Sequence, residues 1–162
     1  MINIHKLLLV FSLLILIVPI FTQSRNTESP APYVAEPQTM EKPSPSDWIK
    51  ESQIKVYDKR IVIDLENAEW AKFTDTNSMD PLIDQNSNAI EIIPKSYKEL
   101  NVGDIISYEK EDVQGIIIHR IIQTGFDEEG WFAVTKGDNL KTQDPFKIRF
   151  NNIKRVVVGI LY

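Results

Sequence analysis

Three short runs of the chain hold a serine, a histidine and acids, the side chains on which serine hydrolases depend. The run TNSMDP contains Ser78, IIIHR contains His119, KGDN contains Asp138, and Asp144 follows in QDP. A serine hydroxyl is a poor nucleophile near neutral pH and needs a base to take its proton. The chain has only two histidines, and the other, His5, precedes an apolar N-terminal stretch. We therefore predict that Ser78 is the nucleophile and His119 its general base.

Each of these residues also has a simpler interpretation. Ser78 is placed to cap the turn before Asp-Pro, and a lone histidine at the end of an apolar strand is often a satisfied core residue. Asp138 and Asp144 both qualify for orienting His119, and the residues alone do not rank them. An aspartate in a tight turn also bonds its own backbone in an Asx-turn. For Gly137 we expect a positive φ or a close backbone approach.

The motifs together, in this order, resemble one family of serine peptidases. The set comprises Ser78-Met79-x-Pro81, Gly103-Asp104-Ile105, His119-Arg120, and Gly137-Asp138-Asn139 with Asp144 beyond it. It resembles the type I signal peptidases, and more narrowly their archaeal and endoplasmic-reticulum branch, in which a histidine stands where the bacterial enzymes carry a lysine. The resemblance covers roughly residues 70–162. It implies a mainly β catalytic domain with a signal-peptidase-like fold behind a single N-terminal transmembrane helix.

The resemblance also implies roles for the residues around the nucleophile. The backbone N–H of Ser78 is the first expected oxyanion donor. Thr76 falls where the bacterial family carries a serine whose hydroxyl is the second donor. Met79 is expected to line an apolar pocket, Pro81 to fix the turn after the nucleophile, and Arg120 to give structural or electrostatic support.

Substrate binding is expected along the residues that precede the nucleophile. An open strand is predicted over Lys72-Phe73-Thr74-Asp75, to which an extended peptide adds by backbone hydrogen bonds, and Phe73, Thr74 and Asp75 are the expected contacts. Met79 is the fourth expected substrate-binding residue. Residues 82–88 depart from the family pattern, which reaches a glycine-aspartate pair sooner, and this leaves the rim of the cleft undefined.

The function implied is that of a membrane-bound serine endopeptidase that removes signal peptides from exported preproteins. Its expected partners are those signal peptides, membrane lipid and, as a further candidate, the export machinery; no cofactor is expected. Two alternatives stay open. One is a self-cleaving or regulatory serine peptidase, although that group uses a serine-lysine dyad and a DNA-binding domain. The other is a catalytically inactive relative that binds exported peptides as a subunit of a complex.

Composition argues against several other classes of protein. The net charge of −5 comes with no basic stripe to neutralise phosphates, which argues against nucleic acid as a partner. The chain has no cysteine, so disulfides, thiolate catalysis and cysteine-zinc sites are excluded. One histidine and scattered carboxylates in the C-terminal region provide no paired-ligand spacing, and we expect no metal site.

The N-terminal third divides into two segments. Residues 1–23 are predicted to be a membrane anchor, because the apolar run 7–21 makes about 22 Å of helix and its flanks can extend this toward the bilayer thickness. A cleavable signal peptide is the competing interpretation. Residues 24–47 are predicted to be a linker because five prolines interrupt any helix or central strand. We expect the N-terminus in the cytoplasm and the domain, residues 48–162, outside the cell membrane.

That domain is predicted to be mainly β. Short alternating or β-branched runs separated by Gly, Asp, Asn and Pro are typical of strands, and no window has convincing helical periodicity. The predicted strands are 54–57, 61–65, 89–93, 104–108, 115–118, 130–134 and 156–160.

Overall fold

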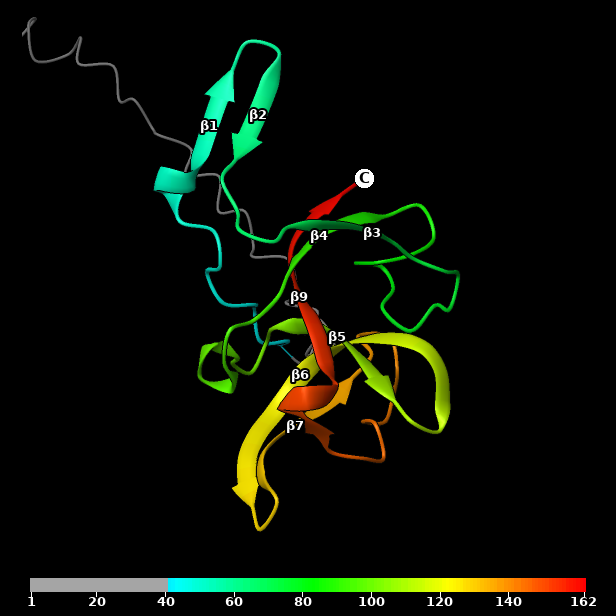
Figure 1. The fold of residues 1–162 in the computed structure, drawn as a ribbon. Helices are drawn as coiled ribbons and strands as arrows, with labels where there is room; N and C mark the ends of the chain where they lie inside the picture. Colours follow the sequence, from blue (N-terminus) through cyan, green and yellow to red (C-terminus); the bar gives the residue numbers. More distant parts are fainter. Residues whose placement is uncertain (1–40) are drawn as a thin grey trace, which may run out of the picture. The chain divides into compact units, whose positions relative to one another are not determined.

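The computed structural model describes residues 41–162, which form one compact unit whose regular structure is mainly antiparallel strands (Figure 1). The predicted anchor and most of the predicted linker lie outside the described residues. The strands are β1 (Ile54–Tyr57), β2 (Arg60–Ile63), β3 (Glu69–Lys72), β4 (Asn88–Ile92), β5 (Ile105–Lys110), β6 (Val113–Asp127), β7 (Gly130–Lys136), β8 (Ile148–Arg149) and β9 (Ile153–Leu161). Three short 3₁₀ helices lie between them, η1 (Glu51–Gln53), η2 (Tyr97–Glu99) and η3 (Phe150–Asn152).

Seven of the strands form one sheet, in the order β3-β4-β9-β5-β6-β7-β8. The predicted mainly β class is therefore confirmed, and all seven predicted segments fall on strands. The sequence analysis missed β3 and β8, which are short, and it underestimated β6, which runs for 15 residues. Gly115 and Gly125 lie within β6, and such glycines divide the pattern without ending the strand.

The sheet buries an apolar cluster on each face, because neighbouring residues of a strand point to opposite sides. Ile105 belongs to one cluster and Ile106 to the other. The first cluster includes Met79, next to the predicted nucleophile, together with Ile83, Ala89 and Val157. The second cluster includes Tyr108, Ile121, Ala133, Ile148 and Val156. The residue that follows Ser78 is thus anchored in the core, whereas Thr76 and Asn77 before it are exposed.

The last residues of the predicted linker pack against the domain. Asp104 is fully buried, and its Oδ1 accepts hydrogen bonds from the backbone N of Ser46 at 2.7 Å and from Trp48 Nε1 at 3.0 Å. The carbonyl of Pro43 accepts from Arg120 Nη1 at 3.1 Å. A Cβ on Gly103 would lie 2.0 Å from the Ser44 carbonyl oxygen, and the φ of Gly103 is +107°. Only glycine fits at position 103. These contacts show that the compact unit includes residues that the predicted boundary at 48 assigned to the linker.

The strands β1 and β2 form a separate two-stranded sheet. Its register pairs Ile54 with Ile63 and Val56 with Ile61, which places four aliphatic side chains on one face. Val56 and Ile61 are 74% and 65% exposed. The face is therefore apolar and uncovered among the described residues.

Within residues 41–162, no helix is long and apolar enough to cross a membrane. The segment predicted to do so, 1–23, lies outside the described residues.

Candidate functional site

Strand β6, an interior strand of the sheet, carries the consecutive residues His119 and Arg120. His119 pairs with Ile106 of β5, and Arg120 pairs with Lys136 at the end of β7. Both side chains are buried, although both are polar. Buried polar groups have to find partners within the protein. The two residues find them in the two acids that the sequence could not rank.

Asp144 is the acid that contacts His119. The imidazole Nδ1 lies 2.8 Å from Asp144 Oδ2 and 3.0 Å from Oδ1. The Tyr108 hydroxyl also donates to Oδ2, at 2.8 Å, and so does Thr135 Oγ1, at 2.5 Å. The backbone N of Asp144 in turn donates to the Thr135 carbonyl at 2.8 Å, which holds the loop against β7.

These hydrogen bonds keep Asp144 ionised. Burial by itself would raise the pKa of its carboxyl, but the donors His119, Thr135 and Tyr108 outweigh burial and leave the pKa below its ordinary value. Burial raises the pKa of the Tyr108 phenol, and the adjacent carboxylate raises it further. Tyr108 therefore stays protonated as a donor.

An ionised carboxylate accepts hydrogen bonds only, so the proton between the two residues sits on His119 Nδ1. In a neutral imidazole with this proton placement, Nε2 carries the lone pair and is able to accept a proton. This is the tautomer that a general base needs when an aspartate holds its other nitrogen. The chemistry available to His119 follows from Asp144.

Asp138 has a different partner. Its two oxygens accept from Arg120 Nε at 2.9 Å and from Nη2 at 2.7 Å, in a two-pronged ion pair whose side chains are both 6% exposed. Burial would raise the pKa of Asp138, but the Arg120 guanidinium holds it below its ordinary value. Arg120 Nη1 also donates to the Gly103 carbonyl at 2.8 Å. The pair thus connects β6 to the turn that carries Asp138.

The turn 137–139 holds the loop that carries Ser78. The backbone N of Asn139 donates to the Ser78 carbonyl at 2.9 Å, and Asn139 Nδ2 donates to the Asn77 carbonyl at 2.9 Å. A Cβ on Gly137 would lie 2.5 Å from the Ser78 carbonyl oxygen. The glycine is therefore needed for a close approach, one of the two expected reasons. Met79 is buried here and its Sδ lies 3.4 Å from the Asp138 backbone N, as an acceptor.

Ser78 and His119 line one cavity of about 730 Å³. Four more of the predicted site residues line it as well: Phe73, Thr74, Thr76 and Met79. Asp75 is not among the lining residues. The strand predicted over 72–75 is wrong beyond its first residue, because β3 ends at Lys72. Asn77, with φ +55°, turns the chain between that strand and the nucleophile. The free strand edge lies at β3 instead.

Within the described chain, the side chains of the predicted nucleophile and base bond to other residues rather than to each other. Thr76 Oγ1 lies 3.2 Å from Ser78 Oγ, while His119 bonds Asp144. In enzymes without substrate, catalytic hydrogen bonds are often long and tighten when substrate binds.

Three residues support the site without having been predicted to do so: Tyr108, Thr135 and Asn139. A signal was available for two of them: Tyr108 and Thr135 are polar residues inside apolar strand runs, where a hydroxyl needs a buried partner. The role of Asn139 was not visible, because it depends on which loop packs against its turn.

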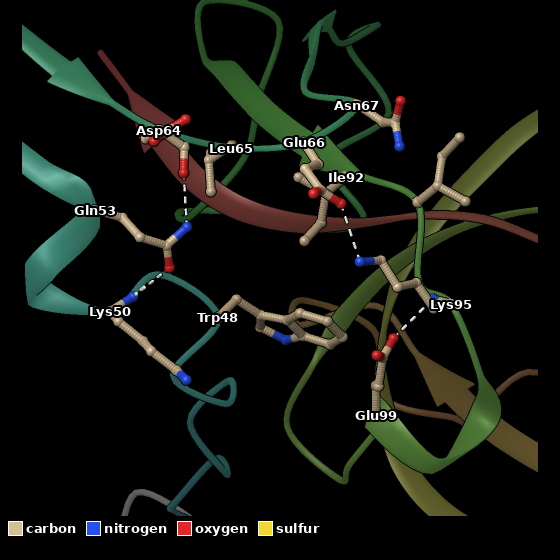
Figure 2. Close-up of a pocket in the computed structure, with 11 residues that line it drawn as sticks. Trp48, Lys50, Gln53, Asp64, Leu65, Glu66, Asn67, Ile92, Lys95 and Glu99 are labelled. Atoms are coloured by element: carbon tan, nitrogen blue, oxygen red, sulfur yellow. Dashed lines mark hydrogen bonds and ion pairs between the residues drawn. The ribbon is translucent and has the colours of Figure 1, made fainter.

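Two other polar features lie away from this cavity. A second cavity of about 510 Å³ is lined by Trp48, Leu65, Ile92 and charged residues, with Lys95 paired to Glu66 at 3.0 Å (Figure 2).

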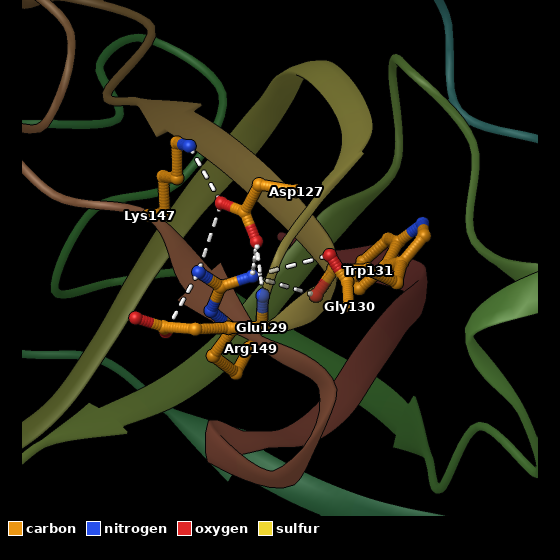
Figure 3. Close-up of polar contacts among 6 residues, drawn as sticks. All are labelled: Asp127, Glu129, Gly130, Trp131, Lys147 and Arg149. Carbon is orange, nitrogen blue, oxygen red and sulfur yellow. Dashed lines mark hydrogen bonds and ion pairs between the residues drawn. The ribbon is translucent and has the colours of Figure 1, made fainter.

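At the β6–β7 turn, Asp127 accepts hydrogen bonds from Arg149 at 2.8 Å and from Lys147 at 2.6 Å (Figure 3). Those contacts tie β8 to the turn. Residues 41–162 contain no cluster of three or more potential metal ligands.

Comparisons with protein-family models, with curated proteins and with solved structures found no match to this chain.

Proposed function

We propose that this protein is a membrane-bound serine endopeptidase of the signal peptidase I type, acting on signal peptides of exported preproteins. The observation that carries the proposal is that His119, which bonds Asp144, lines the same cavity as Ser78. A histidine buried for structural reasons alone does not need to share an open cavity with a serine. The motifs that resemble the family supply the substrate class.

In the proposed reaction, Ser78 Oγ attacks the scissile carbonyl carbon while His119 Nε2 takes its proton. Asp144 stabilises the imidazolium that forms. The backbone N–H of Ser78 and the Thr76 hydroxyl, 3.2 Å from Ser78 Oγ, are the candidate donors to the oxyanion. His119 then passes the proton to the leaving amine, and water hydrolyses the acyl-enzyme by the same base.

Two free strand edges border the cavity and offer a binding mode for an extended peptide. β3 is the end strand of the sheet and pairs only with β4, and its residues Ala71 and Lys72 line the cavity. Across it, residues 116–119 of β6 pair with β5 alone, because the pairing with β7 begins at Arg120. A peptide that adds to such edges gains backbone hydrogen bonds while alternate side chains enter the cavity.

The test is to incubate membranes carrying the full chain with a labelled preprotein, in a background without other signal peptidases. We expect cleavage by the wild type and by Ser52→Ala, a control at an exposed serine, and no cleavage by Ser78→Ala. Processing by Ser78→Ala at the wild-type rate would rule out this mechanism. Binding of preprotein without cleavage by the wild type would favour the inactive peptide-binding alternative.

The proposed location has its own test, because the anchor lies outside the described residues. A protein retained through residues 1–23 should keep Met1 and stay with membranes after alkaline carbonate washing. A mature chain that begins near Arg25 on N-terminal sequencing would instead indicate a removed signal peptide.

A further inference from the structure

Two buried polar side chains line the same cavity and have atoms that lack a partner in hydrogen-bonding geometry. Glu91 of β4 is 5% exposed and Ser107 of β5 is 2% exposed, and both line the cavity that holds Ser78. Among the described residues, no partner is in hydrogen-bonding geometry with Glu91 Oε1 or Ser107 Oγ, although the Ser107 hydroxyl lies close enough to the Glu91 carboxyl to lower its pKa. A buried polar atom without a partner costs free energy, so an unpaired carboxylate oxygen in a cavity wall requires an explanation.

Regular strand alternation places both residues there. Glu91 follows Ala89 by two residues on β4, and Ser107 follows Ile105 by two residues on β5. Ala89 and Ile105 both belong to the apolar cluster that includes Met79, so Glu91 and Ser107 face the same side of the sheet as that cluster. The register shifts against β9 put their extra residues, Val158 and Lys154, on β9 itself.

The nearest cation does not complete the site. Arg155 of β9 lies close enough to lower the pKa of Glu91, but its Nη2 pairs with Glu69, and its Nη1 has no partner among the described residues. Glu69 faces Glu91 across the β3–β4 pair. Glu69, Glu91 and Arg155 together carry one net negative charge when the two acids are ionised. Burial is the largest influence on Glu91 and raises the pKa of its carboxyl.

We propose that Glu91 and Ser107 form a polar subsite that receives a substrate side chain bearing a positively charged hydrogen-bond donor, such as a lysine ammonium group. This inference rests on the proposed peptidase function, because it assigns a specificity to the cleft of that enzyme. An ammonium group donates to an acceptor but has no acceptor of its own, so it matches the free oxygens of Glu91 and Ser107. Charge-assisted hydrogen bonds are stronger than those between neutral groups, and their strength increases in a site that holds little water.

The apolar residues that line the cavity suit a lysine side chain. Ala71, Met79, Ile83 and Ile118 surround the cavity with apolar surface that accepts the methylene stem of a lysine side chain. An aliphatic side chain of the same length fills that space but leaves the Glu91 oxygen unpaired. The subsite therefore discriminates by the terminal group rather than by length.

The experiment uses the full chain with Ser78→Ala, which binds peptides without cleaving them, purified in detergent. Peptides that span a cleavage site carry either lysine or norleucine at one position upstream of the scissile bond, moved one residue at a time. We expect about tenfold tighter binding or more for lysine over norleucine at one position, measured by calorimetry. Glu91→Gln, added to Ser78→Ala, should remove that preference, and Ser107→Ala should weaken it.

The matched control is Glu111→Gln, which removes a carboxylate at an exposed turn and should leave the preference intact. Thermal midpoints of all variants establish that each is folded. Equal affinities for lysine and norleucine at every position, no measurable binding of any peptide, or an unchanged preference in folded Glu91→Gln overturns the subsite. A lysine preference that depends on Glu91 supports it even if the wild-type protein cleaves no preprotein, so the two proposals fail separately.

Discussion

The carboxylate of Asp144 accepts hydrogen bonds from three neighbouring strands: from Tyr108 of β5, His119 of β6 and Thr135 of β7. A carboxylate held by several donors is fixed in orientation and stays ionised. The imidazole bonded to it is therefore fixed in tautomer and in direction. The individual residues that decide the activity can be tested one at a time.

Replacing the base should remove most of the activity. We expect His119→Ala to lower turnover by about 10³-fold or more, since the hydroxyl of Ser78 then has no proton acceptor. Preprotein affinity should change little, because the backbone edges that hold the peptide remain. Single-turnover cleavage with purified protein measures the effect, and a folded His119→Ala protein with near-normal turnover would contradict the assignment.

The two acids should separate in their effects. Asp144→Asn should lower turnover by about 10³-fold or more, because an amide does not hold His119 in the required tautomer. Asp138→Asn should instead lower the free energy of unfolding by about 3 kcal/mol, because it leaves Arg120 buried without its ion-pair partner. Turnover and urea unfolding of both variants measure the two effects. Similar effects of the two replacements on both measurements would contradict the distinction.

The pH dependence of stability should reflect the Arg120–Asp138 pair. The pKa of Asp138 is lower in the folded protein than the ordinary carboxyl value, so the unfolded chain binds a proton first as the pH falls. The stabilisation is complete above the unfolded pKa, about 3.9, and is lost as the pH falls through the folded value. The advantage of wild type over Asp138→Asn should hold at pH 7 and shrink below about pH 4, as measured by urea unfolding. A difference independent of pH would contradict this origin.

At the scale of elements, two loops that are distant in the sequence form one unit. The turn at 137–139 donates backbone and side-chain hydrogen bonds to the loop at 77–79. The Arg120–Asp138 ion pair attaches the same turn to β6. The position of the nucleophile is therefore set by its contact with this turn. A change that moves the turn should affect activity without touching a catalytic group.

Gly137→Ala tests this contact. The added Cβ would lie 2.5 Å from the Ser78 carbonyl oxygen and 2.9 Å from the Leu140 side chain, so the two loops must separate. We expect turnover to fall by about 10²-fold, the effect of misplacing a reacting group by about 1 Å. Gly159→Ala is the matched control, because its Cβ would make ordinary contacts of 3.7 Å with Ile90. Equal activity of the two variants would show that the close approach is unimportant.

At the scale of the whole molecule, the compact unit depends on the residues that lead into it. Ser46 and Trp48 donate to buried Asp104, and the Pro43 carbonyl accepts from Arg120. The leading segment therefore satisfies two buried charged groups, one of which also holds Asp138. Its removal should cost stability, and Trp48 in addition packs against the second apolar cluster.

Two truncated proteins make this measurable. A chain beginning at Glu41 should be more stable than one beginning at Asp47, by about 1–3 kcal/mol, because the shorter chain removes the donor of Ser46 and the acceptor of Pro43. Both should remain folded, since every buried residue of the two apolar clusters lies after residue 47. Thermal and urea unfolding compare them. Equal stabilities would mean that these contacts contribute nothing measurable.

The strands and the candidate residues were predictable from the sequence because both depend on local pattern. Alternating apolar residues with β-branched side chains specify strands wherever the chain goes, and Ser78, His119, Asp138 and Asp144 stand out by type. Short β3 and β8 were not predictable, since a strand of two to four residues depends on its neighbour for its hydrogen bonds.

Only the tertiary structure decided which acid contacts which partner. Asp138 and Asp144 lie six residues apart on one loop, and either spacing is compatible with an approach to His119. The alternation of β6 turns His119 and Arg120 to opposite faces, so the loop must give one acid to each. Tyr108 and Thr135 surround the position that Asp144 takes, and they belong to strands brought together by the sheet register. Glu91 and Ser107 line one cavity because β4 and β5 both pair with β9, an order of strands that neither strand's own residues specify.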